Sequence, residues 1–267
     1  MRLLACRVEI DVDCERLAAW LDAMLSRATQ RYPVSRVHHF AARREDGGYR
    51  LFEDGAPAGF ERSPESAGYA LTARIHKAAL SALPEFTKVH AGCATWQGRR
   101  LLAVGPPRAG KTTLMTRLVF EGFAVHGDEL VLLRDGAALP YPRRFGVREP
   151  TVGLIPQLAA RATAGPLVTD PAALGFDWVV EPAPVAAVFY LEPNHGGGTL
   201  LTPCPKHLMA HRIMAQSTGP SAGKPQWIRD VCAILDSASS HTLVVGGLDE
   251  AVAGIKDVLQ RTPRVAA

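Results

Sequence analysis

The chain has 267 residues, of which 47% are hydrophobic and 21% are charged, and its formal net charge is +4. This composition is too apolar and too weakly charged for a chain that is disordered as a whole, and it can supply one large core or two small ones. The 24 glycines and 20 prolines follow no period, which excludes a collagen-like or low-complexity chain.

The charged residues do not indicate a nucleic-acid or membrane partner. The 30 basic residues are 24 arginines and 6 lysines, and they form no basic stripe interleaved with aromatic residues. The longest apolar runs, such as residues 185–191, are strand-sized and fall far below the roughly 18 residues needed to cross a bilayer. We therefore expect a soluble protein that has neither kind of partner, while a homo-oligomer stays open.

The cysteines and the N-terminal sequence predict a cytoplasmic chain. The five cysteines are odd in number and widely spaced, and they include no C-x-x-C pair, which favours reduced thiols over a disulfide framework. Residues 1–11 alternate charged and apolar side chains too early for a secretion signal, and they predict a first strand instead.

The first third of the chain predicts a small α+β domain with two helices. Apolar residues at helical spacing cover residues 15–31. A second helix is expected over residues 64–83, with Ser63 as its N-cap and Pro64 at its first position.

Turn and stop signals complete this domain. Asp54 and Gly55 form a dipeptide that is typical of a turn between two short antiparallel strands. Pro84 ends the second helix, so we expect one domain over residues 1–84 and another over residues 85–267.

The second domain alternates strands with helices, which predicts an α/β core. The expected strands are 89–96, 100–104, 123–125, 130–133, 184–191 and 241–245, and the expected helices are 111–121, 205–216, 226–237 and 249–259. Residues 152–175 are expected to be rich in loops with one short helix. Glycines 196–198 predict a turn that joins the strand ending at Leu191 to a strand over residues 199–201.

Residues 105–112 match the phosphate-loop (Walker A) pattern G-x-x-x-x-G-K-[ST], and they lie between an expected strand and an expected helix. Backbone N–H groups of such a loop converge on phosphate oxygens, and the positive end of the helix dipole adds to the attraction. We expect Lys111 to bind the β- and γ-phosphates and Thr112 to bind Mg²⁺. The motif therefore predicts a site for ATP and Mg²⁺.

Two prolines alter the entry of this loop, because Pro106 and Pro107 each remove a backbone donor. The donors that matter should then be those nearest the helix. The expected nucleotide contacts are Gly105, Arg108, Ala109, Gly110, Lys111, Thr112 and Thr113. For Arg108 a phosphate contact and a solvated surface position are equally compatible with the sequence.

An acidic pair, Asp128 and Glu129, follows the next short strand. One carboxylate can hold a metal ion together with Thr112, while the other can orient or deprotonate an attacking hydroxyl. The predicted metal ligands are therefore Thr112, Asp128 and Glu129.

The order of features in residues 90–133 resembles the HPr kinase/phosphorylase superfamily, in particular its shorter HPr-kinase-like members. The matching features are a strand histidine (His90), the phosphate loop, a helix followed by Gly122 and Phe123, and the acidic pair. The resemblance implies an α/β fold with a phosphate-loop core. In that family the histidine and the acidic pair flank the transferred phosphoryl group, so the resemblance implies that His90, Lys111, Asp128 and Glu129 take part in catalysis.

The chain departs from the family pattern at three places. The acidic pair of the family is usually Asp-Asp, and Glu129 lengthens the second side chain by one methylene group. Pro107 and Arg108 occupy the middle of the loop, where Ser-Gly is usual. No counterpart of the loop that lets HPr kinases dephosphorylate their substrate is found, so the resemblance does not extend to phosphorylase activity or to HPr as the substrate.

The motif and the resemblance together predict an ATP-dependent kinase. We expect it to transfer the γ-phosphoryl group to a hydroxyl, with a Ser or Thr side chain of a protein or peptide as the favoured acceptor. A kinase for a small metabolite and a non-catalytic ATP-binding regulatory module are the alternatives.

Several residues near the motif have an ordinary structural interpretation as well. His90 read by residue type alone is a strand histidine with a satisfied hydrogen bond, and His126 is expected to be a solvent-facing loop residue. Arg143, Arg144 and Arg148 form either a site for a phosphate or an acidic substrate, or a solvated basic loop.

Two further patterns are expected to be structural. Ser221 lies in a G-x-S-x-G sequence but lacks the buried strand that a hydrolase elbow requires. Cys204, His207 and His211 have spacing compatible with zinc, yet a fourth ligand is missing and the surrounding residues predict an amphipathic helix.

Overall fold

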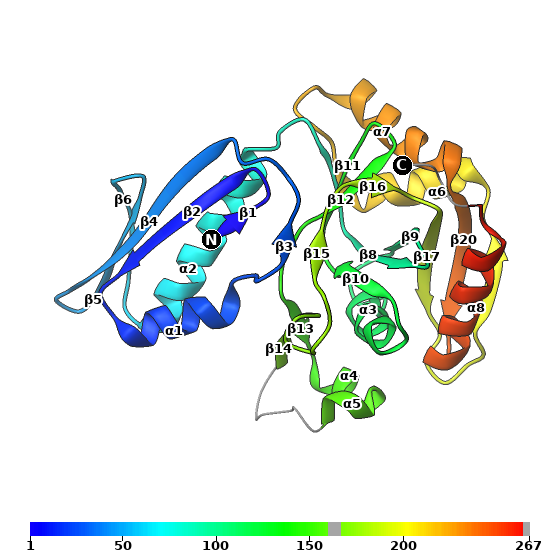
Figure 1. Cartoon of the computed structure of the whole chain (residues 1–267), viewed down its shortest axis with the longest axis horizontal. Coiled ribbons are helices and arrows are strands. Elements are labelled where there is room, and N and C mark those ends of the chain that lie inside the picture. Colours follow the sequence, from blue (N-terminus) through cyan, green and yellow to red (C-terminus); the bar gives the residue numbers. More distant parts are fainter. Residues whose placement is uncertain (160–166, 264–267) are drawn as a thin grey trace. The chain divides into compact units, whose positions relative to one another are not determined.

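The computed structural model describes residues 1–159 and 167–263 as a mixed α/β protein, and the chain divides into two compact units, Met1–Pro84 and Glu85–Ala267 (Figure 1). Pro84, the expected boundary, is the last residue of the first unit. Within the described ranges, the helices are all too short or too polar to span a membrane.

The first unit has a five-stranded sheet, and two helices supply the rest of its core. The strand order is β1 (Arg2–Leu3), β2 (Cys6–Val12), β4 (Arg36–Glu45), β5 (Gly48–Glu53) and β6 (Ala56–Glu61). β2 and β4 are parallel, and the other pairs are antiparallel. The helices are α1 (Glu15–Met24) and α2 (Pro64–Ser81). Alternate strand residues such as Val8, Phe40 and Leu51 are buried, as in a sheet with one covered face.

The start of α2 and the hairpin turn confirm the sequence signals. Ser63 caps α2, since its hydroxyl accepts a hydrogen bond from the backbone N–H of Ser66 at 3.1 Å, and Pro64 occupies the first helical position. Asp54 and Gly55 join β5 to β6 with φ angles of 49° and 81°, which suits the two-residue turn that the dipeptide predicts.

The expected length of the first helix is wrong, because α1 ends at Met24 and residue 31 lies outside it. The chain becomes extended at Leu25 and forms the short strand β3 (Thr29–Gln30). The buried side chain of Gln30 accepts a hydrogen bond from the backbone of Leu4 at 2.5 Å and donates one to the carbonyl of Arg2 at 2.6 Å. These two bonds require residue 30 to lie beside β1, so the helix cannot continue.

The second unit is built on a six-stranded sheet. Its order is β10 (Ala124–Gly127), β8 (Ala91–Trp96), β9 (Arg99–Val104), β17 (Ala187–Pro193), β20 (Ser239–Val245) and β18 (Leu200–Pro203). β9, β17 and β20 are parallel, whereas β8, β10 and β18 run antiparallel to their neighbours.

Helices bury both faces of this sheet (Figure 1). α3 (Lys111–Phe120) and α8 (Leu248–Arg261) contribute Leu118 and Ile255 to the core on one face. α6 (Lys206–Ala215) and α7 (Lys224–Ser237) contribute Ile213 and Ile234 to the core on the other face. The expected helices and central strands of this unit are thus present, with small differences at their ends.

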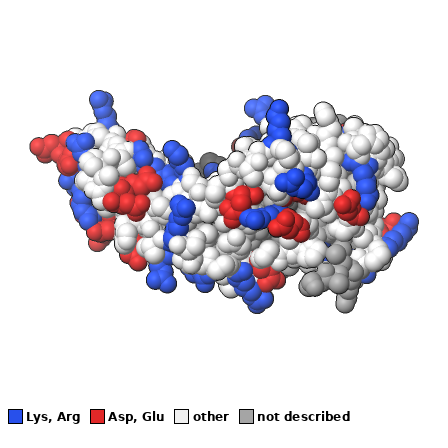
Figure 2. All heavy atoms as spheres, turned by 90° about the horizontal axis from the view of Figure 1, so that it is seen from above, with Lys and Arg blue, Asp and Glu red and all other residues white. Residues whose placement is uncertain are grey.

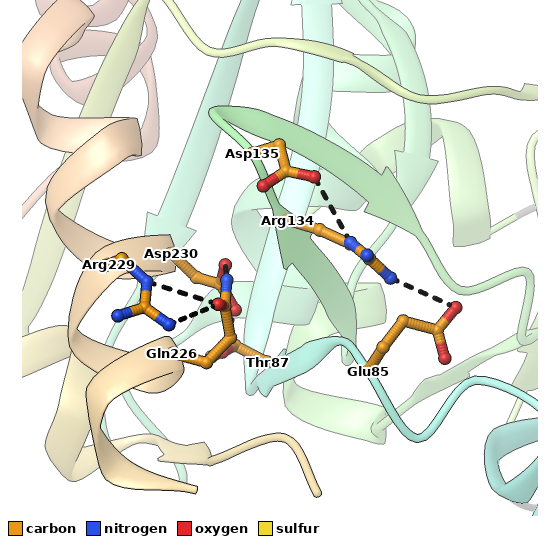
Figure 3. A network of polar contacts seen from close by, with 7 residues as sticks. All are labelled: Glu85, Thr87, Arg134, Asp135, Gln226, Arg229 and Asp230. Carbon is orange, nitrogen blue, oxygen red and sulfur yellow. Dashed lines mark hydrogen bonds and ion pairs between the residues drawn. The ribbon is translucent and has the colours of Figure 1, made fainter. Parts of the chain in front are cut away.

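A smaller sheet packs on the side of α7. Its order is β16 (Ala183–Pro184), β12 (Ala137–Pro140), β11 (Val131–Arg134), β7 (Thr87–Val89) and β19 (Ser217–Thr218). Figure 3 shows how it is fixed: the hydroxyl of Thr87 donates to the buried carboxylate of Asp230 on α7 at 2.7 Å, and Gln226 donates to the same carboxylate at 2.7 Å. Arg134 bonds Asp135 and pairs with Glu85.

The remaining elements connect these layers. They are β13 (Phe145–Val147), α4 (Glu149–Leu154), α5 (Pro156–Ala159), β14 (Leu167–Thr169) and β15 (Val179–Val180), and β13 pairs with β14. The loop-rich expectation for residues 152–175 falls partly outside the described residues. In the described part the chain forms two short helices and a strand.

The expected turn between residues 185–191 and 199–201 is confirmed, since residues 195–197 form a turn between β17 and β18 and the backbone N–H of Gly197 donates to the carbonyl of Asn194 at 3.0 Å. The two strands are not paired with each other, because β20 lies between them, parallel to β17 and antiparallel to β18. Local glycines can mark a turn, but they carry no information about a later strand that inserts between its two arms.

One two-stranded ribbon passes through both sheets of the second unit. β7 and β11 pair in the smaller sheet, while β8 and β10 pair in the larger one. The register is the same on both sides of the crossing, since Val89 lies opposite Val131 and Cys93 lies opposite Gly127. His90 is the crossing residue of the first strand, so the expected single strand over 89–96 is in fact divided there.

Candidate functional site

The 105–112 loop joins the buried central strand β9 to α3, as the motif predicts. Gly110 has a φ of 86°, which a residue with a side chain rarely adopts, and it precedes the first helical residue, Lys111. At Gly105 a Cβ atom would lie 3.0 Å from the carbonyl oxygen of Leu191. The two glycines therefore allow the backbone to turn tightly against β17.

Lys111 lies over this loop. Its Nζ donates hydrogen bonds to the carbonyl oxygens of Gly105 at 2.7 Å and Pro106 at 2.8 Å. Burial lowers the pKa of Lys111 to about 8, against the opposing effect of Asp128 and Glu129. The ammonium group thus belongs to one electrostatic cluster with the acidic pair.

Asp128 lies beside the start of α3. The hydroxyl of Thr112 donates a hydrogen bond to its Oδ2 at 2.7 Å. The residue is only 5% exposed, and burial raises its pKa to about 7, with a further increase from the negative charge of Glu129. A carboxyl group with this pKa can exchange a proton near neutral pH.

His90 contacts the acidic pair at the backbone carbonyl of Glu129. Its Nδ1 lies 2.7 Å from the carbonyl oxygen of Glu129, while its own backbone N–H donates to the carbonyl of Gln216 at 2.8 Å. Burial lowers the pKa of His90, and the positive charge of Lys111 lowers it further. The imidazole is therefore neutral at pH 7, with Nδ1 as the donor to that carbonyl.

The side chain of Glu129 pairs with Arg143. Both carboxylate oxygens lie 2.8 Å from Nη1 of Arg143. The pair is accessible, because the side chains of Arg143 and Glu129 are 50% and 43% exposed. The sequence left open whether Arg143 is a solvated loop residue or a site residue; in the structure it is half-exposed and paired with Glu129.

The segment that carries Arg143 is held firmly on both sides. Tyr141 and Phe145 are buried, and the backbone N–H of Tyr141 donates to the carbonyl of Leu130 at 2.9 Å. Arg144 forms an ion pair with the buried carboxylate of Asp170 at 2.8 Å. Arg144 is therefore a structural residue, in contrast to its neighbour.

The same segment also contacts α3 further along the chain. The hydroxyls of Thr113 and Thr151 lie 2.7 Å apart, which places the start of α4 next to the start of α3. Thr151 and Gln216 could not be predicted, since neither residue lies in a motif and both contacts depend on the tertiary fold. Arg148, the N-cap residue of α4, is exposed.

The expectation that His126 faces solvent is wrong. The residue is 6% exposed, and its ring nitrogens lie 2.8 Å from the hydroxyl of Thr95 and 2.7 Å from the carbonyl of Val179. Burial lowers its pKa to about 4. Trp178 donates a hydrogen bond to the backbone carbonyl of His126 at 2.9 Å, so this residue helps to hold β10 in place.

The other sequence-predicted contacts divide into inner and outer positions. Ala109 is buried under the loop, whereas Arg108 is exposed with a φ of 68°. The structure thus brings together Lys111, Thr112 and the acidic pair, and it places the imidazole of His90 against the backbone carbonyl of Glu129. Arg108 stays at the surface of the loop.

A hollow of about 560 Å³ lies on the first unit. Its lining combines apolar residues such as Ile10 and Phe52 with the side chains of Glu9, Asp11, His39 and Arg43. Two ion pairs, Glu9 with His39 and Asp11 with Arg43, lie in its wall. No residue of the phosphate loop or of the acidic pair lines it.

The oxygen atoms beside the loop fit Mg²⁺ in company with phosphates. Mg²⁺ takes oxygen ligands and keeps several waters, and the hydroxyl of Thr112 and the carboxylate of Asp128 are ligands of this kind. Within residues 1–159 and 167–263, no group of three or more His, Cys, Asp or Glu side chains is placed to hold a metal ion. Cys204, whose spacing to two histidines is compatible with zinc, belongs to no such group, and its thiol accepts a hydrogen bond from Arg212.

No protein-family model and no curated protein matches this chain. The likeness to HPr kinases therefore depends only on the residues between His90 and Leu133 that carry it.

Proposed function

We propose that this chain is an ATP-dependent kinase with an HPr-kinase-like phosphate-loop core. In this proposal it transfers the γ-phosphoryl group of ATP to a hydroxyl, with a Ser or Thr side chain of a protein or peptide as the acceptor. The observation that carries the proposal is the hydrogen bond from Thr112, the second motif residue after Gly110, to the buried carboxylate of Asp128. It unites the loop and the acidic pair, which lie 16 residues apart.

The chemistry of each side chain supports a role in this reaction. Lys111 would exchange the two loop carbonyls for phosphate oxygens, which offer a full negative charge instead of a partial one. Bound Mg²⁺ would neutralise charge on the β- and γ-phosphates, with Thr112 and Glu129 as its protein ligands.

Asp128 is the better candidate for the base, because its pKa of about 7 suits proton transfer at neutral pH. The acceptor hydroxyl would give its proton to this carboxylate while its oxygen bonds to the γ-phosphorus. The bond from that phosphorus to the β–γ bridging oxygen would break, and ADP would leave. Neutral His90 would hold the carbonyl of Glu129 and so position the acidic pair.

The compartment and the partner class are part of the same proposal. All five cysteines are free, which suits a reducing cytoplasm. On the face shown in Figure 2, acidic and basic side chains are interspersed, and a nucleic-acid site would instead gather basic ones. A protein or peptide acceptor is therefore proposed in preference to a nucleic acid.

The proposal is tested by incubating the full chain with γ-labelled ATP, Mg²⁺ and degenerate peptides that contain Ser or Thr. Transfer of label to peptide is expected, and Lys111→Ala or Asp128→Asn should abolish it. Lys206→Ala, on the surface of α6, is the matched lysine control and should transfer label at the normal rate.

Unchanged labelling in both site variants would refute the assignment. Binding of Mg-ATP without any transfer, either to peptides or to a panel of hydroxyl-bearing metabolites, would instead support the regulatory module.

A further inference from the structure

The ion pair between Arg143 and Glu129 is a solvent-accessible contact of the acidic pair. Nη1 of Arg143 makes both contacts, so the pairing is end-on and does not use the two-nitrogen fork that guanidinium groups offer to carboxylates and phosphates. Among the described residues, no other carboxylate is paired with Arg143. An end-on, half-exposed pair is easily exchanged for a better ligand.

The backbone beneath Arg143 is rigid. Its own N–H donates to the carbonyl of Tyr141 at 3.0 Å, and the buried rings of Tyr141 and Phe145 flank the segment. The neighbouring ion pair of Arg144 with Asp170 fixes the chain on the other side. Only the side chain of Arg143 is therefore expected to move, which keeps its range within reach of Glu129 and Asp128.

The charge balance at the site leaves a place for a second cationic side chain. Two carboxylates and the phosphates of a nucleotide would meet Mg²⁺ and one lysine, whose buried ammonium is bound to carbonyls in this structure. The two prolines of the loop remove two of the backbone donors that usually support phosphate oxygens.

We propose that Arg143 is a phosphate-binding residue that leaves Glu129 and uses its free guanidinium edge to contact the γ-phosphoryl group during transfer. The proposal rests on the proposed kinase function and deepens it. In the absence of nucleotide, Arg143 neutralises Glu129; with Mg-ATP bound, the carboxylate turns to the metal and the arginine turns to the phosphoryl oxygens. An arginine at this place stabilises the charge of the transition state from within the same chain.

The test compares Arg143→Ala, Arg143→Lys and the control Arg148→Ala, which removes an exposed arginine five residues further on. Calorimetry measures the affinity for Mg-ADP, for Mg-ATP and for Mg-ADP with aluminium fluoride, a mimic of the phosphoryl group in transfer. Labelled ATP measures kcat and the KM for the peptide acceptor.

We expect Arg143→Ala to lower kcat roughly 1,000-fold and to abolish the extra affinity for the aluminium fluoride complex, with Mg-ADP binding and acceptor KM unchanged. Arg143→Lys should restore part of both, because it keeps the charge but loses the fork. Arg148→Ala should match the unaltered chain.

Arg143 could also act only by holding Glu129. To distinguish this role from phosphate binding, the Arg143→Ala substitution is repeated in a chain that carries Glu129→Gln. If Arg143 contacts the phosphoryl group, the second substitution still removes affinity for the aluminium fluoride complex. If it acts only through Glu129, the second substitution has no effect, and the proposal is overturned.

The failure of this inference differs from failure of the kinase assignment. Normal transfer and normal binding of the mimic by Arg143→Ala would overturn the inference alone. If the unaltered chain binds Mg-ATP but transfers no label, the kinase assignment is overturned. The contact between Arg143 and the phosphate is then decided by calorimetry: it predicts that Arg143→Ala weakens binding of Mg-ATP but not of Mg-ADP. No nucleotide binding by the unaltered chain would overturn both.

Discussion

Among the described residues, the buried charged side chains lie in the second unit of the chain, while the first unit keeps its charges at the surface. In the first unit, ion pairs such as Asp11 with Arg43 and Glu45 with Arg50 lie on strands with between 41% and 73% of each side-chain surface exposed. In the second unit, Lys111, Asp128 and His126 are almost fully buried. Charged groups in exposed pairs contribute mainly to solubility, because water screens their interaction. Buried charged groups have shifted pKa values, which catalysis can use.

The largest expected effect concerns the buried carboxyl. At pH 7, Asp128→Asn should stabilise the second unit by up to about 4 kcal/mol, because burial raises the pKa of Asp128 from 3.8 to about 7 and ionisation penalises the folded state. The folded state binds the proton of Asp128 more tightly than the unfolded state does. The protonated carboxyl therefore contributes to the free energy of unfolding at low pH, and this contribution is lost as the pH rises through 7. The gain from the substitution should therefore vanish near pH 4.

Denaturant unfolding of both proteins between pH 4 and 8 measures this difference. His126, whose pKa is lowered from 6.5 to about 4, makes stability fall with decreasing pH, but it is present in both proteins and cancels. A difference that does not depend on pH would show that Asp128 ionises normally in the folded chain.

A smaller effect is expected at the neighbouring histidine. His90→Ala should lower kcat roughly 100-fold, equivalent to about 2.7 kcal/mol, since the carbonyl of Glu129 loses its donor. His90→Asn, which keeps a donor, should recover part of the rate, and Mg-ADP affinity should be the same in all three proteins. Equal losses in the Ala and Asn variants would point to a role other than positioning.

In the first unit, the helix cap should matter more than any ion pair. Ser63→Ala removes the hydroxyl that accepts from Ser66, and it should cost about 1 kcal/mol. Ser63→Asp keeps an acceptor and should cost little. Hydrogen exchange at the start of α2 measures the change locally, and equal exchange rates in the Ala variant and the unaltered chain would contradict it.

The smallest effect is expected on the open face of the first unit. Asp11→Asn breaks the pair with Arg43, whose hydrogen bond lowers the pKa of Asp11, yet the melting temperature should not change measurably, because both groups stay hydrated. A clear drop in melting temperature would mean that this face is less exposed than it is described, and the contrast between the units would weaken.

The sequence predicted those features whose cause is local. The cap and proline at Ser63 and Pro64, the turn at Gly55 and the strand–loop–helix around Lys111 each depend on residues within a few positions of one another. Local signals of this kind are carried by backbone conformation and nearby hydrogen bonds, so they survive in almost any tertiary context.

The features that were wrong or missed depend on distant contacts. The first helix ends early because Gln30 bonds to β1, and the position of β20 between β17 and β18 was missed. His126 is buried by Val179, which lies 53 residues further along the chain. The pairing of Arg143 with Glu129 likewise spans 14 residues and joins two loops, so spacing alone left it open.

The ribbon that crosses between the two sheets has a consequence for how this site can change. His90 lies between β7 and β8, and Glu129 lies between β10 and β11, in the stretch where the register runs unchanged from the pair Val89–Val131 to the pair Cys93–Gly127. Beyond Gly127 the register shifts by one residue at a bulge in β10, so the ribbon tolerates an extra residue outside this stretch. A residue inserted between the two pairs would instead change the pairing in one of the two sheets, so both layers hold the spacing between His90 and Glu129.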